Sequence, residues 1–157
     1  ELLLMAGQTD RALGLYEQYL LETPWEPGIR NNLSYLLAKL GTDLERGLSL
    51  VQEATAQEAS HSAFYLDTEG WIRYRRGELD IAEQLIRAAL LRSHLGFGDS
   101  LAESLFHLGS VQLAAGKQQE AIRTLLIASF LDPFGGYGQK SREVLKEQSV
   151  DVFGLKQ

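Results

Sequence analysis

Hydrophobic residues recur along most of the chain at the spacing of one face of an α-helix, and short polar segments containing glycine interrupt them. Leu33, Leu36, Leu37 and Leu40 form one such series. Apolar residues at this spacing predict amphipathic helices rather than strands. The pattern predicts an all-α chain with helices near 9–22, 28–40, 43–57, 61–76, 79–92, 100–115, 118–131 and 138–148, after a partial helix at 1–6.

Groups of residues also repeat at fixed offsets. The segment from Gly116 to Ala121 is followed by Leu125, Ala128 and Pro133, and the segment from Gly7 to Ala12 is followed by Tyr16, Tyr19 and Pro24 at the same offsets. A third copy runs from Gly77 to Ala82, and a degenerate fourth, with one additional residue, runs from Gly41 to Gly47. A period of 20 to 50 residues is typical of repeat proteins.

Each copy is divided by its glycine into two helical segments, which predicts a helical hairpin. Glycine adopts the left-handed backbone conformation that ends many helices. Small residues lie at matching positions of the two helices, and Gly109 is expected to face Ala121 so that the paired backbones approach closely.

The pairs Leu108-Gly109 and Glu69-Gly70 precede the loop glycine of their copies by the same distance. Together with the residues above, this arrangement resembles the tetratricopeptide repeat (TPR) family, and in particular repeats of bacterial multi-repeat scaffold proteins. The resemblance implies an all-α, right-handed superhelical solenoid of about four antiparallel helix pairs, the first truncated, followed by a capping helix. Repeats are expected at about 1–26, 27–61, 62–96 and 101–135, with the cap at 137–148, one domain over 1–148 and a tail or linker at 149–157.

Two local features depart from the family pattern. Glu69 stands where leucine is usual, and Gly96–Leu101 is an insertion expected to form a loop between repeats. Trp25, between Pro24 and Pro27, is expected to fill a loop between repeats.

Composition narrows the classes of partner. The chain has 157 residues, a formal charge of −6 and no cysteine. An acidic chain is not attracted to phosphate backbones, so nucleic acid is not an expected partner. No run approaches the 18 to 20 apolar residues of a membrane span, so direct membrane insertion is not expected. The first residue is not Met, and we expect further sequence upstream. The composition does not decide the localisation, so the bacterial cytoplasm and the periplasm or envelope are both compatible with it.

The sequence offers little for catalysis. It has three histidines, His61, His94 and His107, and neither a His-Glu-x-x-His motif nor a phosphate-binding Gly-x-x-x-x-Gly-Lys-Ser/Thr loop. The glycines at 96–98 and 135–138 follow no expected strand and are interpreted as turns. We therefore expect no catalytic residue, no metal and no cofactor.

The TPR resemblance implies instead a concave groove lined by the first helix of each pair. The residues that project onto it are aromatic, polar or cationic, and aromatic and arginine side chains dominate many interfaces. The candidate peptide-binding residues are Asn31, Tyr35, Lys39, Phe64, Asp67, Trp71, Tyr74, Arg75, Phe106, His107 and Ser110. Trp71 is the strongest of them, although packing between repeats is an alternative role; a hydrogen-bonded surface histidine is the simpler interpretation of His107.

The leading hypothesis is a non-enzymatic scaffold that holds an extended or helical segment of another protein in this groove. The alternative is a purely structural segment of a larger array that stacks on flanking repeats, or on a second copy through the truncated N-terminal end, where Leu2–Met5 are expected to miss part of their usual packing partner. A regulatory domain of an enzyme is a third reading. A chaperone-tail adaptor is not favoured, because Asn31, Asn32, Lys39 and Arg75 do not form the set that clamps a terminal carboxylate.

Overall fold

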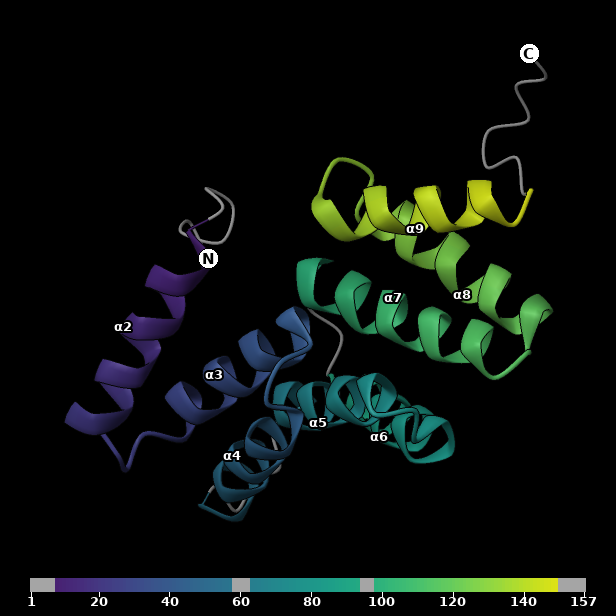
Figure 1. Ribbon diagram of the computed structural model, residues 1–157. Coiled ribbons are helices and arrows are strands. Elements are labelled where there is room, and N and C mark those ends of the chain that lie inside the picture. Colours follow the sequence, from purple (N-terminus) through teal and green to yellow (C-terminus); the bar gives the residue numbers. More distant parts are fainter. Residues whose placement is uncertain (1–7, 58–62, 94–97, 150–157) are drawn as a thin grey trace. The chain divides into compact units, whose positions relative to one another are not determined.

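The structure, a computed structural model, describes residues 8–57, 63–93 and 98–149, and every regular element in those ranges is an α-helix. The helices are α2 (Thr9–Glu22), α3 (Pro27–Leu40), α4 (Leu44–Gln57), α5 (Ala63–Arg75), α6 (Leu79–Arg92), α7 (Gly98–Ala114), α8 (Gln118–Leu131) and α9 (Gly136–Glu147) (Figure 1). The expected partial helix at 1–6 and nearly all of the expected tail lie outside the described residues. The insertion is only partly a loop, because α7 begins at Gly98.

The chain divides into two compact units, Glu1–Gly77 and Glu78–Gln157. The first contains α2 to α5, and the second contains α6 to α9. Within the first unit α3 packs against α2, α4 and α5, and within the second α7 packs against α6, α8 and α9. The helices of the expected third repeat, α5 and α6, belong to different units.

Glycines end several helices, as the sequence predicts. Gly41, Gly77 and Gly116 have φ angles of +72°, +79° and +75°, in the left-handed region where a side chain is strained. The Gly41 N–H donates to the carbonyl oxygen of Leu37 at 2.9 Å, which closes the last turn of α3. The loop glycines of the repeats therefore separate the two helices of a pair.

The core of the first unit consists of apolar residues from the predicted helical faces. One cluster joins α3, α4 and α5 through Ala38, Leu48, Val51, Ala54, Tyr65 and Ile72. A second joins α3 and α4 through Leu33, Leu37 and Leu50, and the partly buried Leu13, Tyr16 and Leu20 of α2 pack against it. Burial of these faces holds α3 between its neighbours.

Small residues allow close packing between α7 and α8 in the second unit. Gly109 of α7 and Ala121 of α8 are both buried. The atoms nearest to Gly109 belong to Leu125, one turn beyond Ala121: a Cβ atom at Gly109 would lie 2.6 Å from Leu125 Cγ. The side chain of Leu125 fills the space that the glycine leaves.

Replacing Gly109 by alanine is expected to lower the free energy of unfolding by about 1–3 kcal/mol, because the added methyl group overpacks the contact with Leu125. Gly47→Ala is the matched control. A Cβ atom there would lie 3.5 Å from Ile72 Cδ1, an ordinary contact, and alanine favours the helix by about 1 kcal/mol. Urea unfolding of both variants measures the difference; equal effects would contradict this account of α7 and α8.

Candidate functional site

The eleven candidate residues lie on three first helices: α3 carries three, α5 carries five and α7 carries three. Lys39, Phe64 and Arg75 are exposed, while Tyr35, Trp71, Tyr74, Phe106 and Ser110 are half-buried, and Asn31, Asp67 and His107 are buried. The candidates therefore form one surface in the first unit, on α3 and α5, and another in the second unit, on α7.

The surface of the first unit combines a stacked aromatic pair with cations. The rings of Trp71 and Tyr74 are stacked, with centroids 4.8 Å apart. Arg75 reaches from α5 to the end of α3, where its Nη1 donates to the carbonyl oxygen of Lys39 at 3.5 Å. A cation at a helix C-terminus stabilises the partial negative charge there. Trp71 also packs against the core of this unit, so the packing role considered from the sequence is present.

Asn31 is an unusual member of this surface. Its side chain is only 8% exposed, and its Oδ1 atom accepts no hydrogen bond from any described group. A buried acceptor without a donor costs about 1–3 kcal/mol. Asn31 shares its helical face with Tyr35 and Lys39, which follow at intervals of one turn. The first unit therefore holds an unsatisfied acceptor on the helical face that carries Tyr35 and Lys39.

The surface of the second unit is an aromatic cluster shared by α7 and α9. The ring centroids of Phe106 and Tyr137 are 5.7 Å apart, and His107 meets Tyr137 edge-on at 6.0 Å. His107 is 1% exposed, so its interpretation as a surface histidine is wrong: aromatic rings cover it. The hydroxyl of Ser110 donates to the carbonyl oxygen of Phe106 at 2.8 Å, within the helix.

Sequence reasoning missed three residues of this cluster: Glu103, Tyr137 and Lys140. Lys140 Nζ lies 4.4 Å from the centroid of Tyr137 and 5.8 Å from that of Phe106, within the range of a cation–π interaction. The Tyr137 hydroxyl donates to the carboxylate of Glu103, 34 residues earlier. Glu103 and Tyr137 thus occupy equivalent positions of successive repeats and are in contact. Extending the repeat period into 137–148 would have identified these residues as part of the site.

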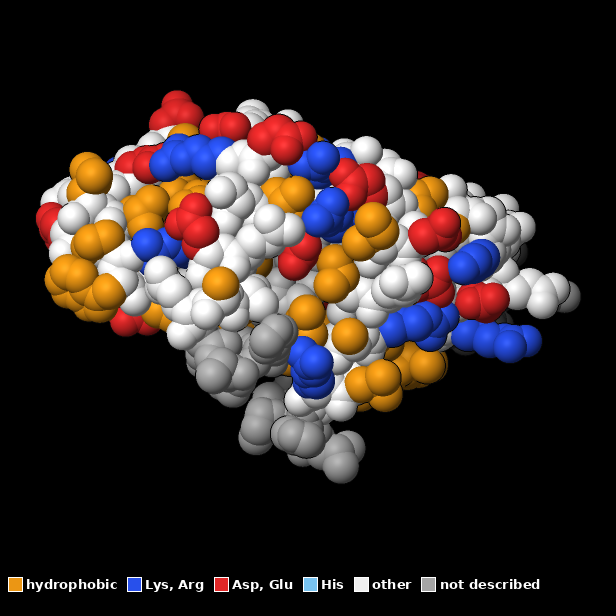
Figure 2. Space-filling view, turned by 90° about the horizontal axis from the view of Figure 1, so that it is seen from below, with side chains coloured by type: hydrophobic (Ala, Val, Ile, Leu, Met, Phe, Trp, Pro, Cys, Tyr) orange, Lys and Arg blue, Asp and Glu red, His pale blue; other side chains and the backbone are white. Residues whose placement is uncertain are grey.

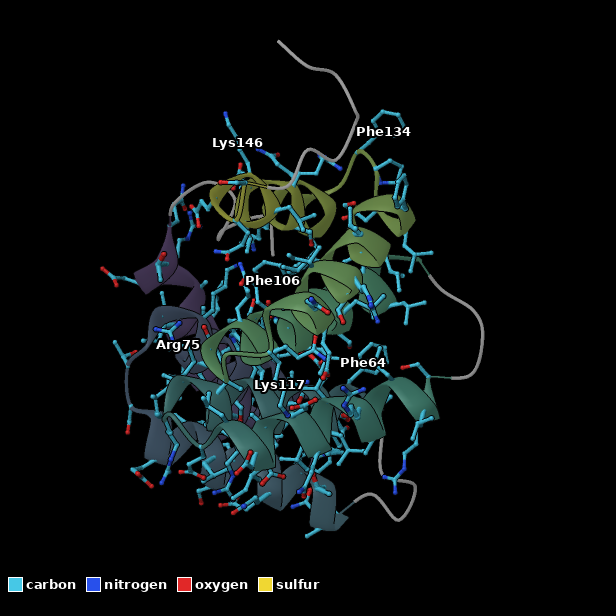
Figure 3. The ribbon with its side chains drawn as sticks, turned by 90° about the vertical axis from the view of Figure 1, so that its right-hand side faces the viewer. Phe64, Arg75, Phe106, Lys117, Phe134 and Lys146 are labelled. Atoms are coloured by element: carbon cyan, nitrogen blue, oxygen red, sulfur yellow. The ribbon has the colours of Figure 1, made fainter. Side chains whose placement is uncertain are left out.

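Figure 3 shows Phe106 on the side of α7 that faces α9. The helix expected as a cap, α9, therefore contributes to the same face as α7. Position 137 extends the aromatic surface of α7, and position 140 adds a positive charge to it.

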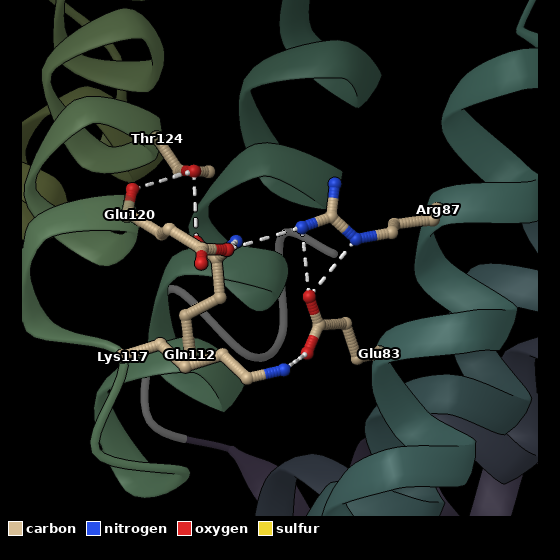
Figure 4. A network of polar contacts seen from close by, with 6 residues as sticks. All are labelled: Glu83, Arg87, Gln112, Lys117, Glu120 and Thr124. Atoms are coloured by element: carbon tan, nitrogen blue, oxygen red, sulfur yellow. Dashed lines mark hydrogen bonds and ion pairs between the residues drawn. The ribbon is translucent and has the colours of Figure 1, made fainter.

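A second polar arrangement joins α6, α7 and α8 in the second unit (Figure 4). Glu83 of α6, which is buried, accepts hydrogen bonds from Lys117 Nζ at 2.7 Å and from Arg87 Nε at 2.9 Å. Arg87 also lies 3.5 Å from Glu120 Oε2, and Thr124 Oγ1 donates to Gln112 Oε1 at 2.8 Å. This network connects α6 to the loop before α8 and fixes that loop.

The charge states of this network do not resemble those of an acid–base site. Burial raises the pKa of Glu83, but hydrogen bonds from Lys117 and Arg87 outweigh it and bring the pKa below the usual value. A general acid needs a raised carboxyl pKa instead.

Beside Lys117 is a hollow of about 450 Å³, lined by Gly116, Lys117, Gln118, Gln119, Glu120 and Arg123. Among the described residues there is no group of three or more side chains suited to hold a metal ion.

Glu83 is expected to make stability depend on acid. Its folded-state pKa lies below the ordinary 4.5, so its contribution is complete above that value and is lost as the pH falls through the lower folded pKa. In Glu83→Gln, we expect a free energy of unfolding about 1 kcal/mol lower at pH 7 and a weaker decline between about pH 5 and pH 3. Urea titrations over this range test it; parallel curves for the two proteins would contradict the prediction.

No family model matches the chain, and no curated protein matches it. Solved structures do match. One is described as MamA 41-end from Desulfovibrio magneticus RS-1: 17% of aligned residues are identical, the TM-score is 0.62, and the match covers 94% of this chain and 80% of that one. A second is the MamA RS-1 ArsTM double mutant, with 18% identity, a TM-score of 0.61, and coverage of 93% and 79%.

These similarities confirm the fold class that the sequence predicts. The chain has an all-α, TPR-like helical-repeat fold. At this level of identity the similarity concerns the fold alone. Within the described ranges, no helix combines the length and hydrophobicity needed to cross a bilayer.

Proposed function

We propose that this chain is a non-enzymatic scaffold whose first-helix faces bind an extended segment of another protein. The observation that carries the proposal is the buried, unsatisfied Oδ1 atom of Asn31. An acceptor of this kind is costly in the free protein; because the atom is enclosed there, a ligand N–H donates to it only when the side chains that cover it move, and the donation then removes that cost. An extended segment suits it, because the backbone N–H groups of such a segment are free to donate.

The surrounding residues support the same mode of binding. Trp71 and Tyr74 form a stacked pair that offers an apolar platform for a partner side chain. Lys39 and Arg75 are exposed on α3 and α5, which favours a segment that carries a carboxylate. Tyr35, Phe64 and Asp67 extend this surface along α3 and α5. In the second unit, Phe106 and Ser110, now with Tyr137 and Lys140, form the corresponding surface, and the buried ring of His107 supports it by packing against Tyr137.

Asn31→Leu tests this proposal, because it removes the acceptor and leaves a side chain of similar size. We expect a free energy of unfolding within about 1 kcal/mol of the wild-type value, or higher, because no hydrogen bond of Oδ1 is lost. We expect the affinity for extended segments selected on a peptide array to fall at least tenfold. Asn32→Leu, at the neighbouring exposed position, is the control and is expected to change affinity less than twofold. Unchanged binding by Asn31→Leu would contradict the proposal.

The structural alternative is favoured by one observation, the apolar surface at the α2 end of the first unit. Tyr19, Leu21 and Trp25 are exposed there, and Figure 2 shows hydrophobic side chains gathered at this end. The expectation that Trp25 fills a loop is therefore wrong. Stacking of further repeats, or of a second copy, would cover this surface. Sedimentation analysis of Trp25→Ser against wild type distinguishes self-association at this end from a monomeric chain.

A further inference from the structure

The C-terminal half of α8 and the loop after it expose a row of large apolar side chains, which we call the α8 stripe. Its members are Ile127, Phe130, Leu131 and Phe134. Phe130 is 68% exposed and Phe134 is fully exposed. Figure 3 shows Phe134 pointing away from the helices. Ile127, Phe130 and Leu131 are spaced at i, i+3 and i+4, so they share one face of the helix.

The loop that carries Phe134 is held in place. Asp132 Oδ2 accepts hydrogen bonds from the backbone N–H groups of Tyr137 and Gly138, at 3.1 and 3.0 Å. These bonds join the end of α8 to the first turn of α9. Phe134 lies between Asp132 and these N–H groups, at the end of the stripe. Its whole side chain is exposed, so no residue of its own loop packs against it.

An exposed apolar residue at this repeat position is not unique to α8, which gives an internal comparison. Phe130 lies nine residues after Ala121, and Leu91 of α6 lies nine residues after Ala82. Leu91 is 85% exposed, but among the residues described around it, its helical neighbours Ala88 and Arg92 do not extend it into a stripe. Single exposed apolar residues need no explanation, whereas contiguous patches mark interaction sites.

We propose that the α8 stripe is a second docking surface, separate from the first-helix faces, and that it binds an amphipathic helix of a partner protein. Apolar residues at i, i+3, i+4 and i+7 are the contacts of a helix that packs along another apolar surface. Arg123 and Asp132 are the charged residues between positions 123 and 134; the Asp132 carboxylate is held by the N–H groups of Tyr137 and Gly138, whereas Arg123 is exposed one turn before Ile127. The partner helix is therefore acidic on its polar side.

The size of the stripe favours a single helix over a second copy of the chain. From the exposed fractions of its four side chains, the stripe offers on the order of 500 Å². A stable interface between two folded proteins buries about 800 Å² on each side, whereas one short helix needs less.

The test uses the whole chain and two fluorescent peptides of about 14 residues, or four helical turns. One has leucines at i, i+3, i+4 and i+7 and glutamates on its polar face, and the other has the same composition with the leucines distributed around the helix. Fluorescence anisotropy measures binding to wild type, to the double variant Phe130→Ser with Phe134→Ser, and to Leu91→Ser. Because the replaced side chains are mainly exposed, all three proteins should fold, which circular dichroism verifies.

We expect the amphipathic peptide to bind wild type at least tenfold more tightly than the permuted peptide. The double variant should lose at least tenfold in affinity, whereas Leu91→Ser should change it less than twofold, and Asn31→Leu should leave it unchanged. Equal binding of the two peptides, or equal binding by the double variant, would overturn the proposal. Two further results would overturn it. One is a dimer of the chain that the double variant abolishes, and the other is binding of the stripe to phosphatidylglycerol vesicles.

Discussion

Gly138→Ala is expected to destabilise the second unit by about 3 kcal/mol, a large effect for the addition of one methyl group. A Cβ atom at Gly138 would lie 1.6 Å from the carbonyl oxygen of Asp132. That obstacle is backbone, so no side-chain rotation relieves it. The loop must move, and the hydrogen bonds from Tyr137 and Gly138 to Asp132 are lost with it.

Gly136→Ala is the matched control for this prediction, because no atom lies within 4 Å of a Cβ at Gly136. We expect its free energy of unfolding to stay within about 0.5 kcal/mol of the wild-type value. Urea unfolding followed by circular dichroism measures both variants. If Gly138→Ala were as stable as Gly136→Ala, the arrangement of the loop between α8 and α9 would be wrong.

Trp71→Ala is expected to weaken binding of an extended segment by about 2 kcal/mol or more, which corresponds to roughly a 30-fold loss of affinity. The physical reason is the loss of the platform that Trp71 forms with Tyr74. Because Trp71 also packs on the core of its unit, the free energy of unfolding should fall as well, by about 3 kcal/mol.

Leu44→Ala separates these two effects of Trp71. Leu44 packs against the same core cluster, but it belongs to α4 and not to a first helix. We expect Leu44→Ala to lower stability and to leave affinity within about twofold of wild type when both are measured well below the unfolding transition. If the two variants lost affinity equally, Trp71 would be a packing residue and not an anchor for the ligand.

The fold could be predicted from the sequence because local and long-range signals agree. The expected bounds 9–22, 79–92 and 118–131 coincide with α2, α6 and α8. In these helices an apolar face of helical period follows directly on a polar loop. Loop glycines with positive φ angles, Gly77 and Gly116, end the helices before α6 and α8. The start of α7 was predicted less well, because the insertion before it breaks the repeat period.

The candidate site was harder to predict, because burial depends on which helix packs over a residue. Periodicity placed His107 on a face of α7, but the ring of Tyr137 against it could be expected only by extending the repeat into α9. The charge of Lys140 predicts an ammonium group surrounded by water. In the structure this group lies over the Tyr137 ring, which stabilises the cation. The sequence could not show that Asn31 Oδ1 accepts no hydrogen bond, because this depends on which donors the fold places around the atom.

Backbone amide chemical-shift mapping by NMR, with an array-selected extended segment added to the chain, tests the central claim most directly. The account predicts the largest shifts on the first-helix faces, around Asn31, Tyr35, Trp71 and Tyr74, with smaller ones around Phe106 and Tyr137. Shifts confined to α2, or to the α8 stripe, with none on α3 and α5, would contradict it.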